Sequence, residues 1–166
     1  MKNTNFEDDD TIPPKARAML NDMAMRVAAE IMKLDEQPRL QIFVTHGFLE
    51  LMVSALIKSK TKNGKKILDD NRSYPYSTQI LILNELSILS NQQYKVYDHF
   101  RKLRNKAAHE PLFELEKEQK NVLDPKNTDE YFGLTCSRLI ANIWNDNIEI
   151  LGPLFLPTLF PKGNGI

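Results

Sequence analysis

Apolar residues recur at intervals of three and four positions along most of this 166-residue chain. That spacing places them on one side of an α-helix, whereas a half-buried β-strand would need strict alternation of apolar and polar residues, which is not seen. Prolines and short polar stretches divide the pattern into segments with helical starts and stops. The sequence therefore predicts an all-α fold, an up-and-down bundle of about five helices.

The five predicted helices cover most of the chain. They span residues 14–33, 38–58, 78–89, 91–109 and 128–151. The polar connection at residues 58–75 has room for one short helix near residues 65–70, and residues 110–126 are expected to lie back on the bundle. The second helix has the fewest polar residues, so we expect it at the centre of the bundle.

Capping residues mark several of these boundaries. Ser90 begins a Ser-x-x-Gln capping box, so the fourth helix starts directly after it and packs antiparallel to the third. Ser77 is the expected N-cap of the third helix and Thr128 that of the last. Gly152-Pro153 is expected to stop the last helix.

The chain divides into one helical domain and two tails. Residues 1–13 are polar, with an acidic run at residues 7–10, and are expected to be disordered. Residues 14–152 form the α-helical domain, which is long enough for a core of its own. Residues 153–166 contain repeated prolines and are expected to form an extended tail.

Composition limits the classes of function. Lys plus Arg and Asp plus Glu both number 22, so the net charge is zero, and any contact with RNA or DNA has to be local. The single cysteine, Cys136, excludes an intrachain disulfide and fits a reducing compartment. With no signal peptide and no run of about 18 apolar residues, we expect a cytoplasmic protein that does not span a membrane.

The most informative polar residues lie at the end of the fourth helix, where Pro111 prevents the helix from continuing. Its apolar residues share one arc that should face the core: Val96, Phe100, Leu103 and Ala107. Four polar residues lie off this arc: Arg101, Arg104, Asn105 and His109. Arginine grips phosphate oxygens in pairs, and histidine can carry a proton near neutral pH. These residues suit contact with a nucleic-acid backbone.

Arg104 and His109 do not share one face, because five residues separate them by roughly 140° around the helix. They can meet at one phosphate only if Arg104 reaches around the helix or a second subunit completes the site. Asn105, four residues before His109, can hold the imidazole. The alternative interpretation is an ordinary helix end, in which Arg104 pairs with a glutamate elsewhere and His109 caps the last carbonyl groups.

The second helix carries one polar pair, His46 and Glu50, four residues apart. One interpretation is a satisfied polar pair at a seam between helices. The other is that Glu50 anchors Arg101 or Arg104 and so positions the residues at the end of the fourth helix. Both interpretations remain open from the sequence.

Arg104, Asn105 and His109 together resemble the Arg-x4-His signature of the HEPN superfamily, small all-α domains found in many nucleases. The wider stretch of residues 37–111, under half of the chain, is similar to the mannitol-repressor-like branch, in which a helical hairpin leads into an Arg-Asn-x-x-Ala-His ending. The resemblance implies a HEPN-like bundle and a two-fold homodimer, with two arginines and two histidines lining one cleft.

Active members of the superfamily cleave RNA without a metal, so the resemblance implies no cofactor. It also implies that His109 is the general acid or base, that Arg104 stabilises charge on the phosphate, and that Asn105 orients His109 or contacts the phosphate. Arg101 and Glu50 are expected to support this site. The toxin members often carry a tyrosine two residues after the histidine, where this chain has Pro111.

Two functions from different classes follow. One is a metal-independent endoribonuclease of a toxin–antitoxin or defence system, with RNA as substrate and an antitoxin as partner. The other is a non-catalytic transcriptional regulator or adaptor of the mannitol-repressor type, acting through protein or nucleic-acid binding. The zero net charge and Pro111 favour the regulator, whereas the complete set of Arg104, Asn105 and His109 favours the nuclease. The three histidines are not spaced as a metal site, and no phosphate-binding loop is present, so neither a metal nor another cofactor is expected.

Overall fold

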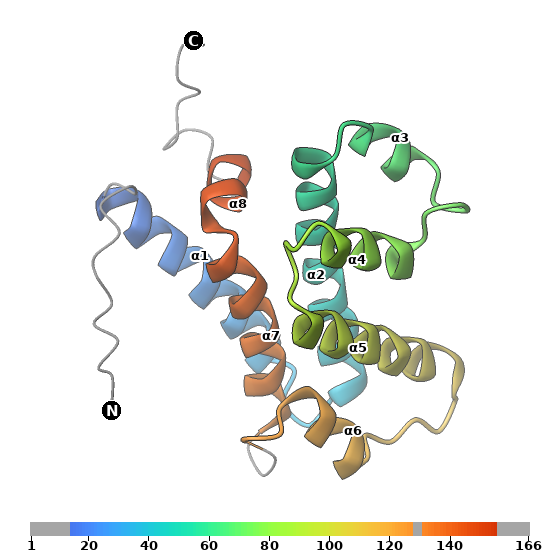
Figure 1. The fold of residues 1–166 in the computed structure, drawn as a ribbon. Helices are drawn as coiled ribbons and strands as arrows, with labels where there is room; N and C mark the ends of the chain where they lie inside the picture. The colour runs from blue at the N-terminus through green and yellow to red at the C-terminus, as the bar shows by residue number, and fades with distance from the viewer. Residues whose placement is uncertain (1–13, 128–130, 156–166) are drawn as a thin grey trace, which may run out of the picture.

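The computed structural model describes residues 14–127 and 131–155, except for the side chains of residues 15–17, 19–21, 23 and 24. These residues form helices and connecting segments without a strand, which confirms the all-α prediction (Figure 1). The helices are α1 (Pro14–Met32), α2 (Pro38–Lys60), α3 (Gly64–Asp69), α4 (Tyr76–Glu85), α5 (Asn91–His109), α6 (Lys117–Leu123), α7 (Phe132–Asp146) and α8 (Ile148–Phe155).

The described part of the chain has eight helices where about five were expected, because three short helices join the five long ones. Helix α3 lies where the polar connection had room for a short helix. Helix α6 forms in the segment that was expected to lie back on the bundle. Helix α8 is separate because the last predicted helix is interrupted at Asn147, whose side chain donates a hydrogen bond to the carbonyl oxygen of Ile143.

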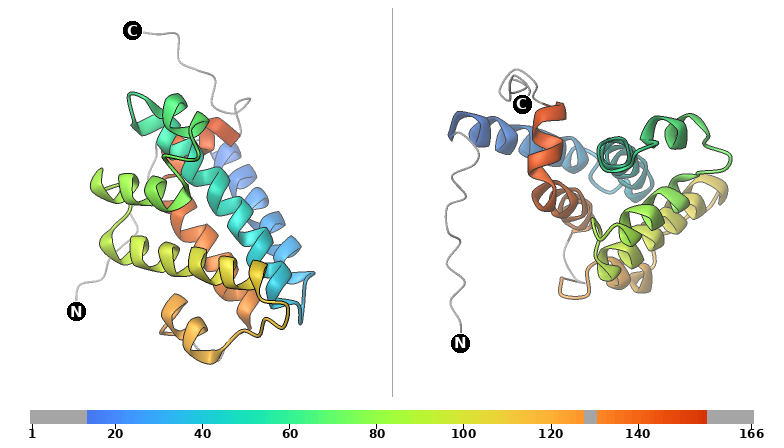
Figure 2. Two further views of the ribbon diagram at one scale, coloured as in Figure 1. Left: turned by 90° about the vertical axis from the view of Figure 1, so that its right-hand side faces the viewer. Right: turned by 45° about the horizontal axis from the view of Figure 1, so that its top comes forward.

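Helix α2 lies at the centre of the fold, as its apolar sequence predicted. It packs against α1, α7 and α8 and, on its other side, against α3, α4 and α5; Figure 2 shows it between these two groups. Nine residues of α2 are buried: Gln41, Ile42, Thr45, His46, Leu49, Met52, Val53, Leu56 and Ile57. The helix that ends in the Arg104 to His109 motif, α5, therefore rests directly on the central helix.

Contrary to the sequence-based expectation, α2 is long and apolar enough to cross a membrane by length and composition alone. Half of the qualifying stretch is buried inside the protein. The core helix of a soluble protein passes the same test, because a helix that is covered on several sides is apolar on several sides. The central position of α2 thus accounts for its composition.

The boundaries of α5 agree with the sequence, whereas those of α4 do not. Ser90 accepts a hydrogen bond from the Gln93 amide at 3.2 Å, and the Gln93 side chain accepts one from the Ser90 amide at 2.8 Å, so the capping box is confirmed. The N-cap of α4 is Pro75 rather than Ser77, with no side-chain cap bond. Helix α4 ends at Glu85 because the chain turns at Ser87, which has φ 58°.

The sequence predicted that the last helix stops at Gly152-Pro153, and this prediction is wrong. Helix α8 includes Pro153 and continues to Phe155, so residues 153–155 belong to a helix and not to an extended tail. The ring of Phe155 packs edge-on against Trp144 of α7, with 5.5 Å between ring centroids, and this contact holds the end of α8 on the bundle. The predictions for residues 1–13, for Thr128 as a cap and for residues 156–166 lie outside the described residues.

Candidate functional site

The motif residues occupy the C-terminal part of α5. Three residues of the predicted apolar arc, Phe100, Leu103 and Ala107, are buried against the core, and the fourth, Val96, is half-buried. Arg104 and Asn105 are half-buried beside them, and His109 is exposed as the last residue of the helix. The helical periodicity therefore predicted three of the four buried residues of α5. It missed Tyr97, which is buried and donates a hydrogen bond from its hydroxyl to the carbonyl oxygen of Leu139 at 3.1 Å.

The guanidinium of Arg104 lies over an aromatic ring of the central helix. Its Cζ atom is 5.9 Å from the ring centroid of Phe43 on α2, and Nη1 donates a hydrogen bond to Oδ1 of Asn105 at 3.3 Å. In the described part of the chain no other group accepts a hydrogen bond from Arg104. Several of its five N–H donors are therefore available to an anion.

Asn105 bonds to Arg104 and not to His109, which corrects the expectation that it holds the imidazole. The charged guanidinium of Arg104 is a stronger hydrogen-bond donor to the amide oxygen of Asn105 than a neutral imidazole is, and Arg104 is the adjacent residue. No described residue forms a hydrogen bond or ion pair with His109. The alternative in which His109 caps the last carbonyl groups of α5 is likewise not observed.

Arg39, which the sequence argument did not single out, holds the chain immediately after His109. Its Nη2 atom donates hydrogen bonds to the carbonyl oxygens of Glu110 and Pro111, the second at 3.0 Å. Its Cζ atom lies 5.8 Å from the ring centroid of Phe113. A basic residue in the first turn of a helix is unfavourable for the helix dipole, and this was the one signal in the sequence that Arg39 has another role.

Arg101 is engaged by a residue of its own helix. Its Nε and Nη2 atoms donate to Oδ1 of Asp98 at 3.0 and 2.8 Å, and Lys102 lies 2.8 Å from the other oxygen of Asp98. Burial raises the pKa of Asp98, but the hydrogen bonds from Lys102 and Arg101 outweigh it, so the net effect is a lowered pKa. Asp98 lies one turn away on the same helix, which makes it the nearer partner.

Glu50 does not anchor Arg101 or Arg104, because Arg101 bonds to Asp98 and Arg104 to Asn105. The interpretation in which Glu50 positions the end of α5 is thereby corrected. The Oε2 atom of Glu50 instead lies 3.5 Å from Nδ1 of His46, the pairing that the alternative interpretation foresaw. Burial lowers the pKa of His46; the charge of Glu50 opposes this shift, whereas the charges of Arg104 and Arg101 add to it. The imidazole is consequently neutral near pH 7.

The pair formed by His46 and Glu50 is not fully satisfied. His46 is 4% exposed, and its Nε2 atom has no hydrogen-bond partner among the described residues. Its ring lies 4.8 Å from the ring of Tyr76, and the buried hydroxyl of Tyr76 also lacks a partner there. Burial strongly raises the pKa of Tyr76, so its hydroxyl stays protonated. Sequence spacing gave no signal for Tyr76, which comes from the start of α4.

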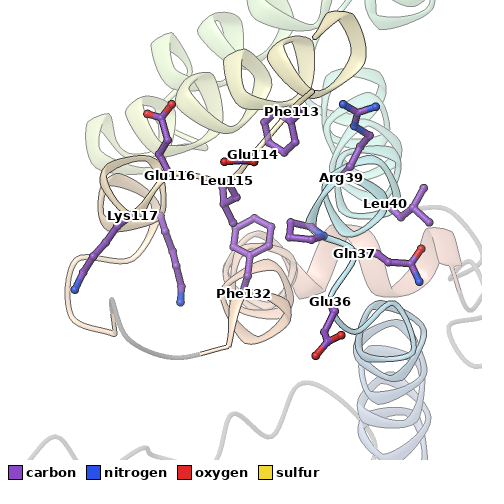
Figure 3. Close-up of a pocket in the computed structure, with 12 residues that line it drawn as sticks. Glu36, Gln37, Arg39, Leu40, Phe113, Glu114, Leu115, Glu116, Lys117 and Phe132 are labelled. Atoms are coloured by element: carbon purple, nitrogen blue, oxygen red, sulfur yellow. The ribbon is translucent and has the colours of Figure 1, made fainter. Parts of the chain in front are cut away.

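A cavity of about 820 Å³ lies beyond the end of α5. Figure 3 shows it between the start of α2, which carries Arg39, and the facing segment, which carries Phe113. Phe132 of α7 and residues of α6 complete the lining. Neither Arg104 nor His109 lines this cavity, so it is separate from the motif.

Other reactive groups are few. Burial raises the pKa of the Cys136 thiol to about 12, so this side chain behaves as part of the core. Within residues 14–127 and 131–155, no three His, Cys, Asp or Glu side chains lie close enough together to hold a metal ion.

Comparison with known proteins gave no match. No family model matches the chain. It matches no curated protein and no solved structure.

Proposed function

We propose that this protein is a metal-independent endoribonuclease of the HEPN type, acting as a two-fold dimer in a toxin–antitoxin or defence system. The observation that supports this function is that the polar groups of Arg104 and His109 are available to a ligand. Arg104 is fixed over Phe43 with unpaired N–H donors, and His109 is exposed with no partner in the described part of the chain. A phosphate binder and a proton carrier are thus presented on one helix.

The reaction that these groups can perform is transfer of the RNA phosphate onto the neighbouring 2′-hydroxyl. His109 removes the 2′-hydroxyl proton, the 2′-oxygen attacks phosphorus, and the bond to the 5′-oxygen breaks. Arg104 stabilises the charge on the phosphate oxygens, and Asn105 holds the guanidinium in position. The 5′-oxygen takes up a proton from an imidazolium, leaving a cyclic phosphate and a 5′-hydroxyl.

A dimer resolves the separation of the two residues on α5. Five residues place Arg104 and His109 about 7.5 Å apart along the helix axis and on different sides of it. Apposing two copies of α5 about a two-fold axis would bring Arg104 of one subunit toward His109 of the partner subunit. Leu112, three residues after His109, is 94% exposed, and an interface at this place would cover it.

We place the protein in the cytoplasm, with RNA as substrate and an antitoxin as protein partner. The buried Cys136 thiol needs no oxidising compartment. Because the net charge is zero, RNA binding depends on local cations such as Arg104 rather than on a basic surface.

The test is cleavage of single-stranded RNA by purified protein in EDTA. We expect products with cyclic-phosphate ends, and His109→Ala should reduce the rate by about 10²–10⁴-fold, the usual contribution of a general acid or base. The matched control is Lys95→Ala, another exposed residue of α5 without a partner in the described chain, which should cleave as wild type does. No cleavage by wild-type protein, tested with and without its genomic neighbour, contradicts the nuclease.

The second candidate is a non-catalytic regulator or adaptor. It is favoured by Arg101, whose charge is engaged by Asp98 instead of being available to a phosphate. Such a protein would bind its partner without forming RNA products, and His109→Ala would leave that binding unchanged. Binding assays with the same variants therefore separate the two functions.

A further inference from the structure

One side of α2 connects the motif to a second hollow in the surface. Phe43, Gly47, Glu50 and Ser54 follow one another at helical spacing and lie on the same side of the helix. Phe43 lies beneath Arg104, whereas the other three residues line an open cleft of about 540 Å³ next to the start of α4. Glu50 is about 10 Å along the helix axis from Phe43.

The lining of this cleft is rich in hydrogen-bond acceptors. Its polar groups come from Glu50, Ser54, Asn71 and Gln79, because the hydroxyl of Tyr76 is buried, and no lysine or arginine is among its described lining residues. Gln79 donates through Nε2 to the carbonyl oxygen of Tyr74 at 3.0 Å, which leaves its Oε1 as an acceptor. A cleft with a carboxylate and without a cation repels phosphate and attracts a group with several N–H donors.

Glu50 is held ready for such a group. The neutral imidazole of His46 faces Oε2 of Glu50 through Nδ1 at 3.5 Å, which orients the carboxylate without neutralising its charge. The Glu50 side chain is 52% exposed and lines the cleft. Tyr76, whose ring packs 4.8 Å from the ring of His46, gives the cleft an aromatic wall, and its own polar atom is buried.

We propose that this cleft binds a guanine base of the RNA substrate, with Glu50 accepting hydrogen bonds from N1–H and the 2-amino group. Guanine alone among the RNA bases presents two adjacent donors on its Watson–Crick edge, which match the two oxygens of a carboxylate. Adenine, cytosine and uracil each present one donor beside acceptors, which a carboxylate repels. The proposal rests on RNA being the ligand of the neighbouring motif, and the distance along α2 allows a phosphate at Arg104 to belong to a nearby nucleotide.

The test begins with nucleosides, because their binding does not depend on cleavage. In NMR titrations of the full chain, we expect guanosine to bind at least about tenfold more tightly than inosine, which lacks the 2-amino group, and than adenosine. Glu50→Gln should abolish the preference, since an amide turns a donor toward the base. The matched control is Glu85→Gln, an exposed glutamate at the end of α4 outside the cleft, which should retain the preference.

Amide shifts of Gly47 and Tyr76 in the wild-type titration locate the ligand without reliance on any variant. Equal binding of the three nucleosides, or shifts confined to other residues, overturns the guanine site even if the protein cleaves RNA. If wild type does cleave, cuts should lie at a constant offset from guanines, and Glu50→Gln should lose this pattern. Guanosine binding that depends on Glu50, together with no RNA cleavage, contradicts the proposed nuclease and supports the cleft.

Discussion

The side chain of Arg104 packs against the central helix of the protein, whereas that of His109 has no packing role in the fold. Arg104 is half-buried over Phe43, whereas His109 is exposed at the end of α5. We expect Arg104→Ala to lower the free energy of unfolding by about 0.5–1 kcal/mol, the size of a cation–π contact. His109→Ala should change it by no more than about 0.5 kcal/mol, as at other exposed sites. Urea unfolding of both variants checks this, and a larger loss for His109→Ala would contradict it.

His46 should make stability depend on pH in a defined direction. Burial holds its pKa in the folded protein below the value of about 6.5 for a free imidazole, so the unfolded chain binds a proton in a range where the folded chain does not. The unfolded state then holds more protons, and the free energy of unfolding falls as the pH is lowered from about 6.5 toward the folded-state pKa. Urea unfolding at a series of pH values measures this slope.

The matched comparison is His46→Gln, which keeps a polar side chain of similar length but does not titrate. Its free energy of unfolding should change less with pH over the same range. An equal slope in both proteins would assign the effect to other groups.

At the residue scale, the sequence predicted three of the four buried side chains of α5, missing Tyr97, but it did not predict the hydrogen-bond partners of the polar side chains. Burial follows from periodicity, a local property that is visible within one helix. Arg39, by contrast, donates a hydrogen bond to a carbonyl group 71 residues further along the chain, and Arg101 bonds to Asp98 and not to Glu50. These hydrogen-bond partners depend on how α2 crosses α5, which helical spacing does not specify.

The helical elements offer a test at two glycines with opposite surroundings. A Cβ atom on Gly64 would lie 2.6 Å from the Lys58 Cα and 2.7 Å from the Ile57 carbonyl oxygen, both backbone atoms at the junction of α2 and α3. Gly64→Ala should therefore destabilise the protein by about 1–3 kcal/mol. Gly47 lies within α2, and a Cβ atom added there would meet nothing within 4 Å, so Gly47→Ala should stabilise the protein by about 0.5–1 kcal/mol.

Thermal and urea unfolding of the two alanine variants should give shifts of opposite sign. Stabilisation by both changes would mean that helix propensity, and not the close approach of α3 to α2, decides the effect at Gly64. The comparison is matched because both changes add one methyl group to a helical residue.

Element boundaries were predictable where the sequence contains a specific stop or start. Ser90 starts α5 through the hydrogen bonds of its capping box, and Pro111 ends it because proline has no backbone N–H to continue the helix. The end of α4 was not predictable in this way, since Leu86 to Leu89 continue the helical spacing while Ser87 takes a positive φ. There, packing of Leu89 in the core overrides local preference.

At the scale of the molecule, the central position of α2 was predictable because an almost wholly apolar helix has to be covered on several sides. The arrangement of the candidate site was not, since the motif extends over a turn and a half of one helix. What the site lacks within one chain is a direct contact between Arg104 and His109, since neither pairs with the other in the described residues. In the proposed dimer a second subunit supplies that contact, and its interface would cover the exposed Leu112.

If each site combines Arg104 of one subunit with His109 of the other, two inactive variants should restore one another. Mixing Arg104→Ala and His109→Ala proteins and allowing exchange gives about half heterodimers, each with one intact site of two, so activity should recover to about a quarter of wild type. Adding Leu112→Asp to both variants should prevent recovery, because an aspartate at that apolar contact separates the subunits, and sedimentation velocity should then show monomers. Leu154→Asp, another exposed leucine but on α8, is the matched control and should not interfere. No recovery in a mixture that sediments as a dimer would show that the two residues act within one subunit or not at all.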